Sequence, residues 1–128
     1  MKKVLVLLAH PNIETSTINN ALFKVATLTK NITSVDLYKE YPDFKINIKK
    51  EQQRLLAHDV IVFLFPLYWY STPALLKQWQ DSVLEYGFAY GSKGNKLHGK
   101  SLLCMIPKEL IKFSCIAQEK LTLARHEL

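Results

Sequence analysis

Continuous apolar runs alternate along the chain with segments whose apolar residues recur at three- and four-residue steps. The apolar runs cover residues 4–9, 60–65 and 101–106, and residues 32–37 form a further short segment of strand-like residues that includes polar positions. Their length and their content of branched side chains are typical of strands that are covered on both faces. The pattern therefore predicts four short strands, and in the run at 32–37 it places Val35 and Leu37 on one side.

The segments between these runs have the spacing of helices. A first helix is expected over about residues 19–29, capped by Ser16 or Thr17, and a second over 48–58. A third begins near Pro73, where a missing N–H costs little. The stripe of the first helix consists of Ile18, Ala21, Leu22, Val25 and Leu28, and that of the third of Ala74, Leu75, Leu76, Trp79 and Val83.

Strands and helices thus alternate, and residues 38–45 and 87–99 are predicted loops, the second holding all four glycines. Such alternation predicts an α/β fold with a parallel sheet and helices on both faces. The 128 residues, 48% of them apolar, are enough for one domain with a buried core.

The cysteines, Cys104 and Cys115, lack metal-like spacing and are expected to be reduced thiols. The segment 1–11 resembles a signal peptide only faintly, because His10 and Pro11 stand where a cleavage site would need small residues. No stretch approaches the roughly 20 apolar residues of a membrane span. The chain is therefore expected in the cytoplasm.

The net charge of +6 favours anionic partners, although dispersed lysines also suit an ordinary solvated surface. No helix-turn-helix, zinc-finger or RNA-binding signature supports nucleic-acid binding. The four histidines (His10, His58, His98 and His126) are too scattered to suggest a metal site.

The end of the first predicted strand carries polar residues that suit an anion. Ligands of open parallel sheets bind beyond the carboxyl ends of the strands, where a helix start offers N–H groups to phosphate. His10 follows this strand, and Ser16, Thr17 and Asn19 lie where the helix begins. The alternatives are an ordinary helix cap at Ser16 and a partly exposed loop histidine at His10.

The end of the third predicted strand carries an aromatic loop over residues 66–71. Consecutive extended residues point to opposite faces, so Tyr68, Trp69 and Tyr70 cannot all enter one core. They either line a seat for a flat ring or fill the rim of the core. With no GxGxxG and no GxxxxGK[ST], neither a dinucleotide Rossmann site nor a Walker loop is supported. A site for an anion beside a site for a flat ring suits a mononucleotide that carries a large aromatic ring system.

A family resemblance rests on four motifs. These are AHPxxxxSxxN at 9–19, YPDF at 41–44, PLYWYSTPALLKQWQDSVLEYGFAYG at 66–91 and KLHGK at 96–100. Over about residues 1–103 the chain resembles the flavodoxin-like NAD(P)H:quinone oxidoreductases. The most similar groups are the modulator-type quinone reductases and the ancillary proteins of glutathione-regulated potassium-efflux systems.

The resemblance implies bound FMN, with FAD the less favoured cofactor, NAD(P)H as co-substrate, and a homodimer with active sites between subunits. Hydride would pass from NAD(P)H to the flavin and two electrons then to a quinone. No catalytic side chain is assigned, because the flavin carries the chemistry. By matching position, the cofactor would be held by His10, Ser16, Thr17, Ile18, Asn19, Pro66, Leu67, Tyr68, Trp69 and Tyr70. Phe88 and Tyr90 would face the partner subunit's pocket.

The resemblance covers residues up to about 103, and the fourth predicted strand ends at residue 106. The family continues with a TTGG-like turn, a strand and a helix that this chain lacks, which indicates a version truncated at the C-terminus. We therefore expect a flavodoxin-like FMN-binding domain over 1–106 and a divergent tail over 107–128, with the spacing of one helix. In the family's strand order, 2-1-3-4-5, the fourth strand would then be an exposed edge.

Three functions remain open at this point. The first is an FMN-dependent quinone reductase. The second is a regulatory subunit of a potassium-efflux antiporter, peripheral at the inner membrane surface, where positive charge suits anionic lipid. The third is an inactive fragment.

Overall fold

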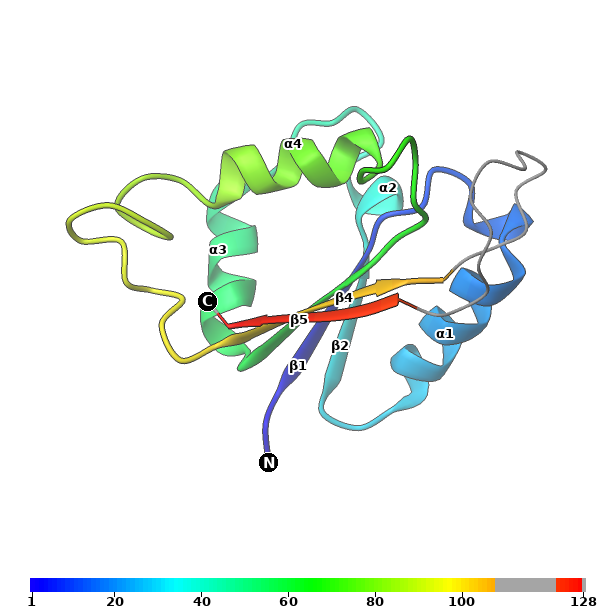
Figure 1. The fold of residues 1–128 in the computed structure, drawn as a ribbon, viewed down its shortest axis with the longest axis horizontal. Helices are drawn as coiled ribbons and strands as arrows, with labels where there is room; N and C mark the ends of the chain where they lie inside the picture. Colours follow the sequence, from blue (N-terminus) through cyan, green and yellow to red (C-terminus); the bar gives the residue numbers. More distant parts are fainter. Residues whose placement is uncertain (108–121, 128) are drawn as a thin grey trace.

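The computed structural model describes residues 1–107 and 122–127, with side chains over 1–107 (Figure 1). Its five-stranded sheet has the order β2-β1-β3-β4-β5, and the first four strands along the chain are parallel. These are β1 (Val4–Leu8), β2 (Ile32–Asp36), β3 (Val60–Leu64) and β4 (Ser101–Ile106), followed by β5 (Thr122–Glu127). The four predicted strands and the expected order of the sheet are confirmed.

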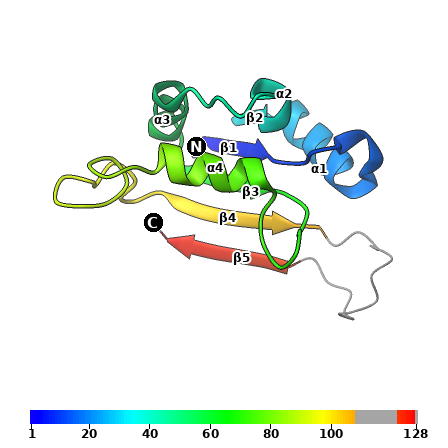
Figure 2. The same cartoon turned by 90° about the horizontal axis from the view of Figure 1, so that it is seen from above.

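Helices cover both faces of this sheet (Figures 1 and 2). They are α1 (Thr17–Leu28), α2 (Leu37–Glu40), α3 (Ile48–Ala57) and α4 (Ala74–Val83), with a 3₁₀ turn, η1 (Ile13–Thr15), before α1. Alternate residues of β1 divide the core: Leu5 and Leu7 pack with α3 and α4, whereas Val6 and Leu8 pack on the side of α1. Within the described residues, no helix is long and apolar enough to cross a bilayer.

Two local expectations need correction. The predicted loop at 38–45 begins inside a helical turn, α2, because the Asp36 side chain accepts a hydrogen bond from the N–H of Lys39 and caps it. In α1 the buried side is also offset from the expected stripe. Leu22, Phe23 and Ala26 pack on the sheet, while Ile18, Ala21, Val25 and Leu28 are exposed.

The tail differs from the expected helix at its end. Residues 122–127 form β5, which pairs antiparallel with β4 from Ile106↔Thr122 to Ser101↔Glu127. The unpaired N–H and C=O groups of an edge strand favour such pairing, so the prediction that β4 is the exposed edge was wrong. The rest of the predicted tail helix, 108–121, lies outside the described residues.

A buried polar cluster joins α3 to α4 and to the chain after α2. Glu51 is fully buried, and its carboxylate accepts hydrogen bonds from the Tyr41 hydroxyl at 2.7 Å and the Trp79 indole N–H at 3.0 Å. The Arg54 guanidinium pairs with Glu51 and with Glu40. Burial and the hydrogen bond to Glu51 raise the pKa of Tyr41, so its hydroxyl remains a donor. We call these five residues the Glu51 cluster.

Candidate functional site

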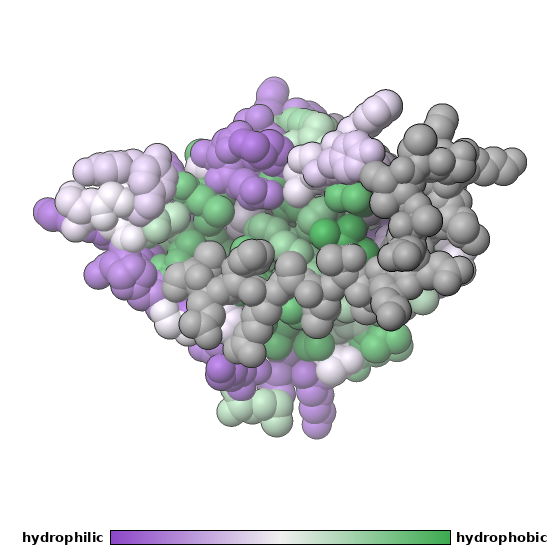
Figure 3. Space-filling view, in the orientation of Figure 1, coloured by the Kyte–Doolittle hydropathy of each residue, from purple (hydrophilic) through white to green (hydrophobic). Residues whose placement is uncertain are grey.

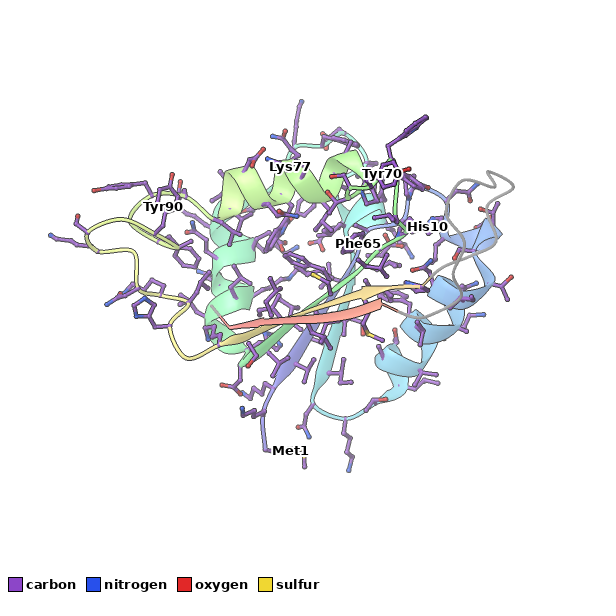
Figure 4. The ribbon with its side chains drawn as sticks, in the orientation of Figure 1. Met1, His10, Phe65, Tyr70, Lys77 and Tyr90 are labelled. Carbon is purple, nitrogen blue, oxygen red and sulfur yellow. The ribbon has the colours of Figure 1, made fainter. Side chains whose placement is uncertain are left out.

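The two segments singled out in the sequence lie at the same edge of the sheet. Register pairs Leu8 with Leu64, and the N–H of Ala9 donates to the carbonyl of Leu64 at 2.9 Å. His10, Phe65 and Tyr70 accordingly gather at one end of the molecule (Figure 4). We call this the carboxyl edge, because β1 to β4 all end there.

The turn from β1 into α1 is organised around Ser16. Its hydroxyl oxygen accepts hydrogen bonds from the backbone N–H of Asn19 at 3.3 Å and from the Asn19 amide at 2.9 Å. Both residues are almost fully buried, at 1% and 0% exposed. Thr17 and Ile18 form the first two positions of α1, at the positive end of its helix dipole. The helix start therefore has the geometry that suits a phosphate.

His10 is buried, at 6% exposed, rather than a partly exposed loop residue. Its Nδ1 accepts a hydrogen bond from the N–H of Asn12 at 3.0 Å. An accepting Nδ1 places the imidazole proton on Nε2. Nε2 is therefore the donor nitrogen of this ring at the carboxyl edge.

The aromatic loop forms a tight turn. Tyr68 and Ser71 exchange backbone hydrogen bonds of 2.9 Å in both directions. Between them Trp69 and Tyr70 both have positive φ, 47° and 62°. Asn-Gly pairs usually occupy such turns, and each bulky residue held there costs about 1–3 kcal/mol. The strain presents two rings to the surface, since Trp69 is 95% exposed and Tyr70 71%.

The other residues of this loop divide between core and surface. Pro66 is buried, whereas Leu67 and Tyr68 are 45% and 38% exposed. The aromatic residues therefore line a surface at the carboxyl edge, and the alternative that they fill the rim of the core is not supported. Strain of this kind is typical of functional sites.

Unsatisfied polar atoms mark the same two segments. Among residues 1–107, three buried side-chain atoms lack a hydrogen-bond partner, and two of them are Asn19 Oδ1 and Thr72 Oγ1. Buried polar atoms are nearly always paired, so such exceptions point to a missing ligand or water. FMN, with a phosphate at one end and a tricyclic ring at the other, fits residues of these types. The sequence analysis did not single out Thr72 as a site residue. Its position next to the aromatic loop was the feature of the sequence that could have indicated it.

A cavity of about 410 Å³ also opens at the carboxyl edge. It is lined by the turn after β1 and by the start of α2, including Asp36, Tyr38 and Lys39. The Tyr38 hydroxyl accepts a hydrogen bond from the N–H of Leu75 at 3.3 Å and so links this cavity to the start of α4. Residues 66–71 do not line the cavity, so the two expected seats share an edge rather than one enclosed hollow.

Phe88 and Tyr90 lie elsewhere. Phe88 is 8% exposed and belongs to the core beneath α4. Tyr90 is 60% exposed, stacks edge-to-face on Tyr86 at 5.7 Å, and lies far from His10 and Tyr70 (Figure 4). Within one subunit neither residue reaches the carboxyl edge, and their role toward a partner stays a prediction.

The fold and this edge define an α/β protein of the ligand-binding doubly wound type. Residues 2–109 match the model of a family described as having a flavodoxin-like fold, and the chain belongs to that family.

Curated relatives extend the likeness. The chain is 58% identical over 104 residues to a Bacillus subtilis protein named uncharacterized NAD(P)H oxidoreductase YrkL, covering 81% of this chain and 60% of the relative. It is 56% identical to the Cronobacter sakazakii glutathione-regulated potassium-efflux system ancillary protein KefG, covering 81% of this chain and 56% of the relative. The chain thus spans 56–60% of the length of these two relatives.

Solved structures agree in fold. General stress protein 14 of Treponema denticola, in complex with FMN, superposes with a TM-score of 0.71 at 47% identity, covering 77% of this chain and 57% of that one. An NADPH-quinone reductase from P. pentosaceus superposes with a TM-score of 0.67 at 40% identity, covering 78% and 56%.

Proposed function

We propose that this chain binds FMN at the carboxyl edge and supports two-electron transfer from NAD(P)H to a quinone. The observation that carries the proposal is the pairing, at one edge, of a Ser16-capped helix start with the strained turn of Trp69 and Tyr70. The related chain that was solved with FMN, and the relatives named for NAD(P)H oxidoreductase and quinone reductase activity, support it.

In this proposal, His10 and the residues from Ser16 to Asn19 hold the phosphate and the adjoining chain. Phosphate is matched by N–H donors and by the positive end of the α1 dipole. Residues from Pro66 to Tyr70 hold the ring through backbone groups and aromatic contact, and Thr72 offers a hydroxyl beside them. Bound FMN supplies the hydride and electron chemistry, and the chain binds and orients it.

The proposal includes a homodimer in which Phe88 and Tyr90 contribute to the partner's substrate pocket, and a cytoplasmic location. Phe88 would act there by supporting the loop, since its own ring is buried. Tyr90 is exposed enough to reach a second subunit. Measured molar mass in solution, with and without FMN, tests the dimer.

Activity is tested with the FMN-loaded chain. NADH or NADPH oxidation is followed while a soluble quinone is varied at several fixed nucleotide concentrations. Parallel lines in double-reciprocal plots are expected, because hydride and electron transfer occur in separate half-reactions. FMN binding without any nucleotide oxidation would refute the reductase and favour an inactive flavin-binding fragment.

A second candidate is a regulatory subunit of a potassium-efflux antiporter, favoured by the 56% identity to the ancillary protein KefG. Co-purification with such an antiporter is the test. Retention of the complex by the double variant Trp69→Ala with Ser16→Ala would assign a docking role that does not need the cofactor. Loss of the complex in that variant would tie docking to the cofactor.

A further inference from the structure

The two edges of the sheet carry opposite charge. At the edge where β1 to β4 begin, which we call the amino edge, the connections are 1–3, 29–31, 58–59 and 84–100. They carry six lysines (Lys2, Lys3, Lys30, Lys93, Lys96 and Lys100) and two acids, Asp59 and Glu85. Glu127, at the end of β5, lies at the same edge opposite Ser101. Among residues 1–107, the segments at the carboxyl edge carry four acids (Glu14, Asp36, Glu40 and Asp43) and two lysines (Lys39 and Lys45).

Lysines of the amino edge are close in space as well as alike in charge. The N–H of Val4 donates to the carbonyl of Asn31 at 2.9 Å, which brings Lys30 beside Lys3. A backbone hydrogen bond from Lys3 and the nearby charges of Lys100, Lys2 and Lys3 lower the pKa of Asp59. Figure 3 shows hydrophilic residues along the lower margin of the molecule, where β1 begins.

Several of these ammonium groups are free to meet a partner. Lys2, Lys3 and Lys30 are exposed, and their side chains make no ion pair or hydrogen bond with any residue of 1–107. By contrast, the ammonium group of Lys77 on α4 pairs with Asp81. Exposed ammonium groups that lack local partners contribute little to the stability of the fold. Their concentration at one edge therefore indicates contact with an external partner.

We propose that the amino edge is a docking surface for an anionic lipid bilayer. Clusters of four to eight lysines bind anionic membranes, each lysine strengthening partition by roughly fivefold. The connections at this edge of the sheet present their lysines side by side, and such an arrangement can contact a wide, flat surface such as a bilayer. Tyr86 and Tyr90 are exposed in the connection that also holds Lys93 and Lys96, so a nucleic-acid strand, which would stack on aromatic rings, is the alternative that the test includes.

This orientation has a consequence for the carboxyl edge. The strands run from one edge to the other, so a bilayer at the amino edge leaves the carboxyl edge, with the exposed rings of Trp69 and Tyr70, facing the solution. Soluble nucleotides then reach the proposed cofactor site unhindered. The lipid proposal does not depend on that site being active.

The test is co-sedimentation of the full chain with vesicles of phosphatidylglycerol and phosphatidylcholine, against vesicles of phosphatidylcholine alone. The triple variant Lys2→Gln, Lys3→Gln, Lys30→Gln is compared with Lys24→Gln, Lys49→Gln, Lys77→Gln, which removes the same charge from α1, α3 and α4. We expect the first triple to lower partition into anionic vesicles at least tenfold and the second less than threefold. Binding by the parent chain should fall as salt rises from about 50 mM to about 500 mM.

Three results would overturn the proposal. They are equal binding to neutral vesicles, equal losses in the two triples, and a duplex oligonucleotide that displaces the chain from vesicles at equal phosphate concentration. As a control for folding, both triple variants should melt cooperatively at the same temperature as the parent chain. We expect this for the first triple because its altered side chains make no ion pair among the described residues.

Discussion

The Glu51 cluster and the aromatic turn belong to one small fold, yet the cluster pairs its buried polar groups whereas the turn holds a strained backbone. In the cluster each oxygen of a fully buried carboxylate has a donor, Tyr41 and Arg54 on one and Trp79 on the other. In the turn, Trp69 and Tyr70 hold left-handed backbone and expose their rings. The difference separates a region that stabilises the fold from one whose strained backbone and exposed rings are typical of a functional site.

The largest expected effect lies in the cluster. Glu51→Leu leaves Arg54 charged and without a partner on one side, and leaves the Tyr41 and Trp79 donors unpaired. Losing one member of such a buried group costs about 3–5 kcal/mol in the free energy of unfolding. Urea denaturation measures it. The control, Asp81→Asn, breaks an exposed pair with Lys77 and should cost less than about 0.5 kcal/mol, so equal losses would contradict the contrast.

Ser16 is expected to serve both stability and binding. Ser16→Ala removes the cap of α1 and should cost about 1 kcal/mol, together with about a tenfold loss of FMN affinity. Asn47→Ala is the matched variant, since Asn47 caps α3 through the N–H of Lys50 at 3.1 Å. It should cost similar stability and change FMN affinity less than twofold. Unfolding curves and flavin fluorescence titrations check both, and parallel affinity losses would refute a specific role of Ser16.

Replacing a residue by glycine normally lowers the free energy of unfolding, but at Tyr70 the relief of backbone strain should raise it. Tyr70→Gly removes a side chain from a residue with φ of 62° and is expected to raise the free energy of unfolding of the FMN-free chain by up to about 1 kcal/mol. Leu67→Gly, three residues earlier and without a positive φ, should lower the free energy of unfolding by a similar amount. A stability loss in both variants would show that the turn stores no strain.

The smallest effect concerns acid stability. Burial would raise the pKa of Glu40, but hydrogen bonds and charges from Arg54 and Lys50 hold it below its ordinary value of 4.5. The resulting stabilisation is present above that value and is lost as pH falls through the lower folded pKa. Glu40→Gln should therefore reduce stability by less than about 1 kcal/mol at neutral pH, and this difference should shrink below about pH 4.5. A difference that is constant down to pH 3 would contradict it.

Periodicity was sufficient for the regular elements and for their order, because continuous apolar runs and helical stripes reflect burial directly. It could not give α2, whose single turn depends on the cap from Asp36. Nor could it give β5, since the apolar residues of the tail also have helical spacing and the pairing depends on a distant edge.

At the site, the residue types predicted a phosphate-binding segment and a ring-binding segment, and the structure places these two segments at one edge of the sheet, while their ligands stay a prediction. The left-handed backbone of the aromatic turn could not be predicted from the sequence, because Trp69 and Tyr70 lack the Asn-Gly pair that normally indicates such a turn. Thr72 was missed because an unpaired hydroxyl is visible only once its neighbours are placed.

The most direct measurement titrates the FMN-free chain with FMN and with riboflavin, and repeats both titrations with Ser16→Ala and Trp69→Ala. The account predicts that the parent binds FMN about 100-fold tighter than riboflavin, since charge-assisted hydrogen bonds hold the phosphate. Ser16→Ala should narrow this ratio, and Trp69→Ala should weaken both ligands while preserving it. Equal affinity of the parent for the two flavins, or no binding of either, would contradict a cofactor seat at the carboxyl edge.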